Sequence, residues 1–297
     1  MATYQVNPTL ARRRTRQTGD ISRRQHHIPA ALIGGFGQPA GSGRRRDATV
    51  AVRWRNGSRG VQVVAASHIG WRSNEYRLQE PGHGDPDFLD RAWTALENDL
   101  PPTVARLASR SPVPADYGTI IAYIAGAGVR HPTFGEHARA ERSARGEKAP
   151  EGDAIQWERV STLRGSFDIL EEWHFRVLHR PAEAPPFLIS DFGWCKFQVG
   201  GRGPTAHVFP LNSDCAILAY PPSPQLAPTH ASGINAHFTL VPSVMDLINS
   251  TAWAAPETSW VAIHPIYWDY LNRLEQLQGI QWPWLGPYRG RRGDLFD

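Results

Sequence analysis

The chain has 297 residues, 41% of them hydrophobic and eleven of them tryptophan, which supplies apolar surface for a sizeable core and excludes disorder throughout the chain. No stretch approaches about 18 uninterrupted apolar residues, so no membrane-spanning helix and no membrane partner are predicted. The formal net charge of +4 conceals an asymmetry, because residues 1–60 hold twelve arginines against Asp20 and Asp47 and the remainder is mildly acidic.

The first predicted element is a basic arm. Residues 1–24 are polar and arginine-rich and show no apolar periodicity, which predicts a flexible segment rather than a packed one. Residues 25–36 then have Pro29 early and Gly34-Gly35 near the end, which is the pattern of a short helix. A loop rich in glycine and arginine separates this helix from the next element.

A β-hairpin is the clearest local pattern in the sequence. Residues 49–55 alternate from one face to the other, and a second apolar run begins at residue 61 and extends to 68. Between them stands Asn56-Gly57, a pair that tolerates the positive φ of a tight hairpin turn. We therefore predict two antiparallel strands joined at this turn. The residues expected to face the core are Val50, Val52 and Trp54.

Helices and further strands follow from the spacing of apolar positions. Helices are predicted over residues 87–107, 117–127, 243–252 and 265–277. Residues 134–153 are charged and alanine-rich, which predicts a solvated helix followed by a loop. Short strands are predicted over residues 173–178, 187–190, 208–211 and 216–220.

The order of these elements predicts an α+β fold with a mixed antiparallel sheet and packed helices, because strands and helices come in blocks rather than in strict alternation. No linker rich in Pro, Gly and Ser separates two halves, so residues 25–297 are predicted to form a single domain. Cys195 and Cys215 lack the CxxC spacing, which argues against a disulfide scaffold and a cysteine zinc site. A reducing compartment, the cytoplasm, is the predicted location.

Several short motifs occur in a fixed order along the chain. They are Gln25-His26-His27-Ile28-Pro29, Leu96-Glu97 on a helix, Arg130-His131-Pro132, Ile189-Ser190-Asp191 and Phe209-Pro210-Leu211. In this order they resemble the bacterial and fungal family called domain of unknown function 4238, over roughly residues 25–265. The family usually continues Ser-Asp with Asn-Pro-Val, whereas Phe192-Gly193-Trp194 follows here. The resemblance implies a fold neighbourhood, and it carries no established activity.

Four polar residues are candidates for one site: His27, Glu97, Arg130 and Asp191. Glu97 and Arg130 lie on otherwise apolar helices, where a buried charge must be paired because an unpaired one is very costly. Asp191 ends a strand, and a neutral imidazole such as that of His27 can bind a metal ion. The alternatives are a structural ion pair, a His27 that caps a helix, and an Asp191 that bonds its own turn.

The first functional hypothesis is a hydrolase that acts on phosphodiesters or nucleic acid with the help of a divalent metal. His27, Glu97 and Asp191 would hold the ion or act as a base, and Arg130 would steady the negative charge that develops on phosphate. A pocket that gathers these groups and is open to solvent would favour an enzyme, whereas a dry, paired network would favour a binding protein.

The alternative hypothesis is a non-catalytic protein that binds nucleic acid or an acidic partner through arginine. The arginines expected to contact phosphate lie in the arm and before the hairpin, and are Arg12, Arg13, Arg14, Arg44, Arg45 and Arg46. A third hypothesis is a tailoring enzyme that acts on a small molecule in the acidic body of the protein and does not use the arm.

Overall fold

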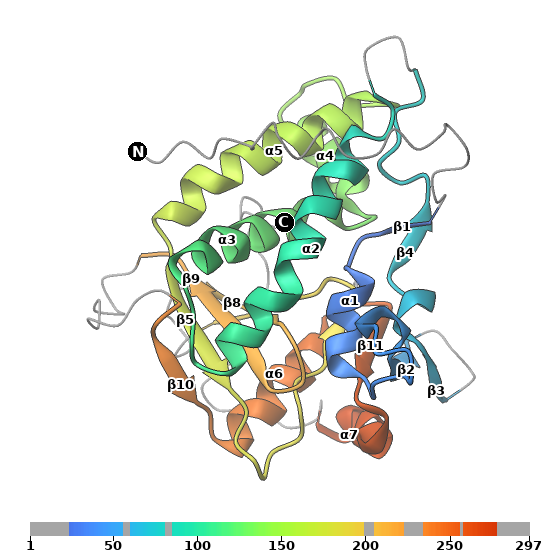
Figure 1. Ribbon diagram of the computed structural model, residues 1–297. Helices are drawn as coiled ribbons and strands as arrows, with labels where there is room; N and C mark the ends of the chain where they lie inside the picture. Colours follow the sequence, from blue (N-terminus) through green and yellow to red (C-terminus); the bar gives the residue numbers. More distant parts are fainter. Residues whose placement is uncertain are drawn as a thin grey trace.

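The structure of the chain is a computed structural model with an α+β fold, as the order of elements predicts (Figure 1). It describes residues 24–55, 60–80, 85–198, 205–222, 234–255 and 258–277. The predicted basic arm lies outside these residues except for Arg24, and so do Arg12, Arg13 and Arg14. A large hydrophobic core runs through both large sheets, and a second, smaller cluster gathers around Tyr76, Trp93 and Phe134.

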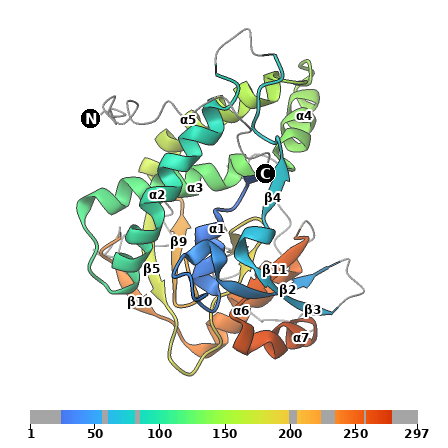
Figure 2. The same cartoon turned by 45° about the vertical axis from the view of Figure 1, so that its right-hand side comes forward.

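The predicted hairpin is confirmed and forms the edge of a four-stranded sheet, in which Val50 pairs antiparallel with Val64. In sheet order the strands are β3 (Val61–Ala65), β2 (Thr49–Trp54), β11 (Trp260–Ile263) and β6 (Ile189–Ser190). Val50 and Val52 are fully buried, and Trp54 is partly buried against the core. The turn at Asn56-Gly57 lies outside the described residues. Figure 2 brings this sheet forward, with β2 and β3 above α7 (Trp268–Leu277).

The second large sheet has five strands. In sheet order they are β10 (His237–Thr239), β5 (His174–His179), β9 (Cys215–Tyr220), β8 (Thr205–Pro210) and β7 (Cys195–Gln198). Neighbouring strands are antiparallel except β10, which joins β5 in parallel at the edge, so the sheet is mixed. The strands predicted at 173–178, 208–211 and 216–220 are confirmed within a few residues.

The helix predicted over residues 25–36 is wrong in its first part. Residues Arg24–His26 form β1, which pairs antiparallel with β4 (Trp71–Ser73), and His27 N–H donates to the Gly70 carbonyl at 2.9 Å. Helix α1 covers only Ala30–Ile33, followed by a short 3₁₀ turn. The reason lies in Pro29, because the residue before a proline is pushed towards extended backbone and the helix cannot begin earlier.

The long helices gather on one side of the strands in Figure 1. They are α2 (Phe88–Ala108), α3 (Pro114–Arg130), α4 (Phe134–Ala144) and α5 (Ala154–Glu171), and α6 (Pro242–Ala254) lies at the other end. Helix α2 continues through Pro101 and Pro102 instead of ending there. Among the described helices, none is both long and apolar enough to cross a lipid bilayer.

Candidate functional site

Three of the four predicted site residues meet where β1, α2 and α3 come together. Arg130 is the last residue of α3 and is only 3% exposed. Its Nη2 donates to Glu97 Oε1 on α2 at 2.5 Å and to the carbonyl oxygen of His26 at 2.5 Å. The guanidinium also lies over the ring of Trp93, 5.1 Å from the ring centroid. The structural ion pair expected for Glu97 and Arg130 is therefore present.

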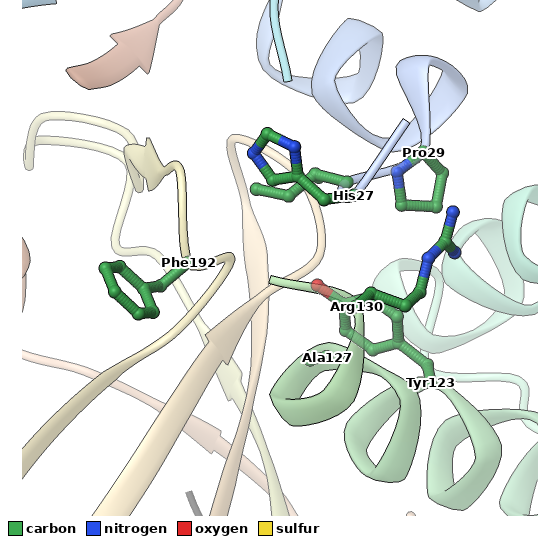
Figure 3. Close-up of a pocket in the computed structure, with 7 residues that line it drawn as sticks. His27, Pro29, Tyr123, Ala127, Arg130 and Phe192 are labelled. Carbon is green, nitrogen blue, oxygen red and sulfur yellow. The ribbon is translucent and has the colours of Figure 1, made fainter. Parts of the chain in front are cut away.

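His27 and Arg130 line a small cavity, which they enter from different segments (Figure 3). The other lining residues are Ile28, Pro29, Tyr123, Ala127 and Phe192. The cavity measures about 10 Å³, which is room for about one water molecule. Both ring nitrogens of His27 and the Nε of Arg130 are buried and have no hydrogen-bond partner among the described residues. These atoms are the unsatisfied polar groups that one water molecule in the cavity could serve.

The imidazoles beside the cavity are neutral at physiological pH. Burial, followed by the nearby His131 and Arg130, holds the pKa of His27 well below its ordinary value. Burial lowers the pKa of His131 to about 3. The Thr133 N–H donates to His131 Nδ1 at 3.3 Å, so neutral His131 carries its proton on Nε2. The His131 ring stacks on Phe192 with centroids 3.7 Å apart, and His27 approaches it edge-on at 5.6 Å.

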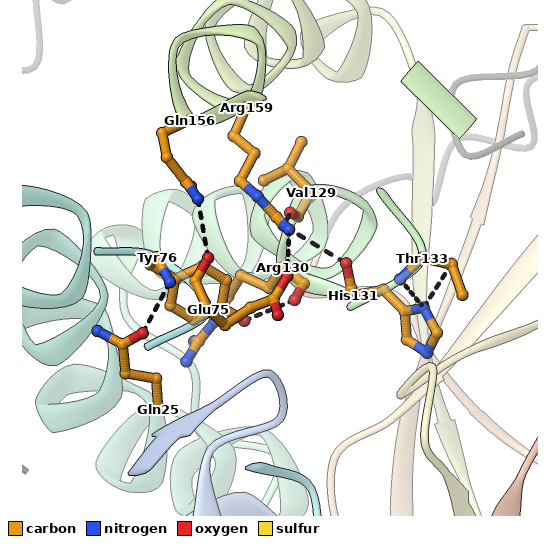
Figure 4. A network of polar contacts seen from close by, with 9 residues as sticks. All are labelled: Gln25, Glu75, Tyr76, Val129, Arg130, His131, Thr133, Gln156 and Arg159. Atoms are coloured by element: carbon orange, nitrogen blue, oxygen red, sulfur yellow. Dashed lines mark hydrogen bonds and ion pairs between the residues drawn. The ribbon is translucent and has the colours of Figure 1, made fainter. Parts of the chain in front are cut away.

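A buried polar network fixes the end of α3, and with it Arg130 (Figure 4). Arg159 of α5 is 1% exposed, pairs with Glu75 at 2.6 Å and donates to the backbone carbonyls of Val129 and His131. Tyr76 donates its hydroxyl to the Arg130 carbonyl at 2.5 Å. These donors satisfy carbonyls that the end of a helix leaves unpaired. The charges of this network are paired, although the Nε of Arg159 has no hydrogen-bond partner among the described residues.

The structure does not bring Asp191 into this group. Asp191 is 4% exposed, and its Oδ2 accepts a hydrogen bond from Ser259 N–H at 2.9 Å, beside β11. Burial raises its pKa to about 6, with opposing contributions from Ser259 and Arg55. Its Oδ1 has no partner among the described residues, and Asp191 is not one of the residues that line the cavity, although its neighbour Phe192 is. Asp191 therefore belongs to a separate polar region beside Ser259 and does not share the cavity with His27 and Arg130.

The expected divalent metal does not fit these side chains. Among the described residues there is no group of three or more His, Cys, Asp or Glu side chains placed to hold a metal ion. Glu97 is engaged by Arg130 and Asp191 by Ser259, so the ligand set proposed from the sequence does not assemble around His27. No catalytic step is assigned to a metal here.

Exposed arginines surround the network on its outer side. Arg44, Arg45 and Arg46 are all exposed, although Arg44 pairs with Asp47 at 2.9 Å. Arg45 and Glu97 line one shallow depression. Burial lowers the pKa of His26, Glu97 opposes this change, and the charge of Arg46 adds to it.

Arg72 on β4 is also exposed, and its charge contributes to the lowered pKa of His27. We call Arg45, Arg46 and Arg72 the arginine face.

Sequence reasoning missed three residues of this region. Arg72 stands on a three-residue strand without an arginine run, so no local pattern marks it. His131 was part of a motif, but its stack on Phe192 depends on a contact between segments 61 positions apart. The unusual Phe192 after Ser-Asp was the available signal, since a polar Asn was expected there.

Comparison of the chain with protein-family models, with curated proteins and with solved structures gives no match. The resemblance to the domain of unknown function 4238 family therefore remains a prediction from the motifs.

Proposed function

We propose that this protein binds nucleic acid through the phosphate backbone, with the arginine face as the contact surface. One observation carries the proposal: Arg45, Arg46 and Arg72 are exposed and have no ion-pair partner among the described residues. By contrast, Arg130 and Arg159 are buried and paired. Unpaired guanidinium groups on one surface attract phosphate and release its counterions, which drives binding without reading the sequence. The cytoplasm, predicted from the cysteines, is the proposed location.

The site geometry supports binding over the two enzyme hypotheses. The charges of Arg130 and Arg159 are paired with Glu97 and Glu75, and a paired network is the arrangement expected of a binding protein. The cavity beside them holds about one water molecule, whereas pockets for small-molecule substrates measure roughly 300–1,000 Å³. A small-molecule tailoring reaction therefore has no support from the cavity beside Arg130.

The test is a binding titration with labelled single-stranded and double-stranded oligonucleotides at about 50 and 200 mM salt, two concentrations at which counterion release gives clearly different affinities. Replacing all three residues of the arginine face by glutamine is expected to weaken binding about tenfold or more at low salt. It should also reduce the number of counterions released on binding, which the slope of log affinity against log salt concentration measures. The reduction should be up to about three, one for each lost phosphate contact.

The matched control removes three exposed arginines from other elements, so the net charge changes equally. These are Arg139 on α4, Arg164 on α5 and Arg273 on α7. This control should bind almost as the unchanged protein does. Equal losses in both triple variants would show that only overall charge matters, and undetectable binding at low salt would end the proposal.

A second candidate function is hydrolysis of the bound phosphodiester. It rests on the His27 nitrogens and the Arg130 Nε that have no partner among the described residues and adjoin a cavity the size of one water molecule. Neutral His27 would take a proton from that water.

In this case His27→Gln should reduce turnover of bis(4-nitrophenyl) phosphate by about 100-fold or more, the usual contribution of a general base. The exposed His137→Gln serves as the control and should leave turnover unchanged. Equal turnover in His27→Gln and the unchanged protein would contradict the hydrolysis candidate. The proposal that the protein binds nucleic acid would not be affected.

A further inference from the structure

A second cluster of basic side chains lies at the edge of the five-stranded sheet, away from the arginine face. His179 ends β5 and His237 begins β10, the neighbouring parallel strand shown in Figure 1. Thr239 pairs with His179 in the register, and strand side chains alternate between faces, so His179, His237 and Thr239 share one face. His179 Nε2 lies 2.8 Å from His237 Nδ1, and the two rings stack with centroids 5.1 Å apart.

Arg110 covers this pair from the end of α2. It follows the helix with a positive φ of 58°, and its Nη2 donates to Thr239 Oγ1 at 2.8 Å. Burial lowers the pKa of His179 to about 4, with Arg110 and His237 adding to the effect. Burial and then Arg110 also lower the pKa of His237, and the backbone of Ile234 opposes them. The groups that face the pair are therefore predominantly positive.

The other charged groups nearby are already engaged. Asp214, which precedes the β9 residue opposite His179, binds Arg180 at 2.7 Å. Arg176 of β5 lies over Phe238, which points to the opposite face of β10 from His237. Arg110 is exposed, and His237 is only partly buried, with the backbone of Ile234 beside its imidazole. The cluster thus combines a solvent-facing cation, an exposed hydroxyl and a hydrogen-bonded pair of imidazoles.

We propose that Arg110, His179, His237 and Thr239 form a binding site for a small divalent oxyanion of the phosphate class, separate from the nucleic-acid surface. The guanidinium supplies charge and a planar set of donors, Thr239 supplies a hydroxyl, and the imidazole pair supplies a further N–H. A phosphate or sulfate accepts hydrogen bonds from all of these groups.

The imidazole pair gives the site its pH dependence. Only one hydrogen fits between two nitrogens 2.8 Å apart, so the pair can take up one additional proton but not two. A bound dianion offsets the positive field of Arg110 and favours that protonated pair, since an opposite charge stabilises the charged form. Binding is therefore coupled to uptake of one proton and strengthens as the pH falls below the ordinary histidine pKa.

Calorimetric titration of the full chain with inorganic phosphate and with sulfate at pH 6 and pH 8 tests the site. Sulfate remains a dianion at both pH values, so its affinity reports protonation of the protein alone. We expect sulfate to bind about fivefold or more tightly at pH 6 than at pH 8, because binding takes up a proton. Titration with glycerol phosphate shows whether the natural ligand is a free anion or a phosphate group on an organic molecule. An affinity equal to that of phosphate indicates a phosphomonoester ligand, and a weaker affinity indicates the free anion.

Two variants locate the binding. Arg110→Gln and His237→Gln should each weaken anion binding about tenfold, because each removes a charge-assisted hydrogen bond. Arg164→Gln on α5 removes the same charge elsewhere and should have no effect. Thr239→Val removes the hydroxyl at an exposed position and should also weaken anion binding. This variant replaces His237→Gln in the test if His237→Gln fails to fold. Absence of saturable binding at pH 6, or unchanged binding in Arg110→Gln and Thr239→Val, would overturn the proposal.

Discussion

Replacing Arg159 by methionine is expected to lower the free energy of unfolding by about 3–5 kcal/mol, the usual cost of breaking a buried ion pair. Arg159 is almost fully buried, and its guanidinium serves Glu75 and two backbone carbonyls at the end of α3. Methionine fills much of the volume but leaves these acceptors without a donor, which is the expensive outcome of such a change. Urea denaturation followed by circular dichroism measures the loss.

The control for this prediction is Arg142→Met. Arg142 also makes two ion pairs, with Glu147 and Glu158, but its side chain is 37% exposed. Exposed pairs contribute little because water and salt screen them, so the loss of Arg142 should destabilise the protein far less than the loss of Arg159. Similar losses in the two variants would mean that burial does not set the strength of the Arg159 network.

Lowering the pH from 7.5 to about 4 is expected to destabilise the protein by on the order of 5 kcal/mol, since each unit of pKa is worth about 1.4 kcal/mol. Burial lowers the pKa of His131 and of His207 to about 3 and that of His179 to about 4. The unfolded chain takes up protons near the ordinary pKa of 6.5, before these folded-state groups do. Stability is therefore lost as the pH falls below 6.5.

Carboxylates do not add to this loss. The raised pKa of Asp191, about 6, lets the folded chain take up a proton before the unfolded chain does, which opposes the histidine effect between pH 6 and 4. Hydrogen bonding to Arg106 is the main cause that lowers the pKa of Asp116 to about 2, so its contribution is lost only below its ordinary value of 3.8. Loss of stability between pH 6.5 and 4 therefore reports the histidines. His131→Gln retains an acceptor for the Thr133 N–H but cannot be protonated, so its stability should depend less on pH in this range.

Exposed His68→Gln is the control for the acid transition and should follow the unchanged protein. Urea denaturation at pH 7.5, 6, 5 and 4 gives the comparison. A protein equally stable at pH 7.5 and 4, or a His131→Gln variant with an unchanged pH profile, would contradict the assignment of this transition to buried neutral histidines.

Local patterns determined a large part of this fold. The strands of the hairpin were predictable because alternation acts over a few residues, and the structure pairs the two strands antiparallel. The buried helix α3 was recognisable from its continuous apolar positions, although it extends to Arg130. The Arg130–Glu97 pair followed from one physical rule, that a charge on an apolar helix needs a partner.

Short strands were outside the reach of local patterns. β10 has three residues and β11 has four, and each is held by strands distant in sequence, such as β11 between β2 and β6. Segments this short form no pattern of their own, because their backbone pairing is supplied by the sheet. The same is true of β1, where pairing with β4 and the constraint of Pro29 prevailed over a pattern that favoured a helix.

The sequence by itself determined the fold class, the strands of the hairpin, helices α2, α3 and α6, and the need to pair Glu97 with Arg130, whereas α5 was not predicted. Only the tertiary structure decided which polar groups share a site: it placed Asp191 beside Ser259, added Arg72 to the outer face, and joined His179 to His237. These relations depend on how strands and helices far apart in the chain pack together. Sequence spacing determines on which face of a helix or strand a side chain lies. Which other residues that face contacts is determined by the packing between elements.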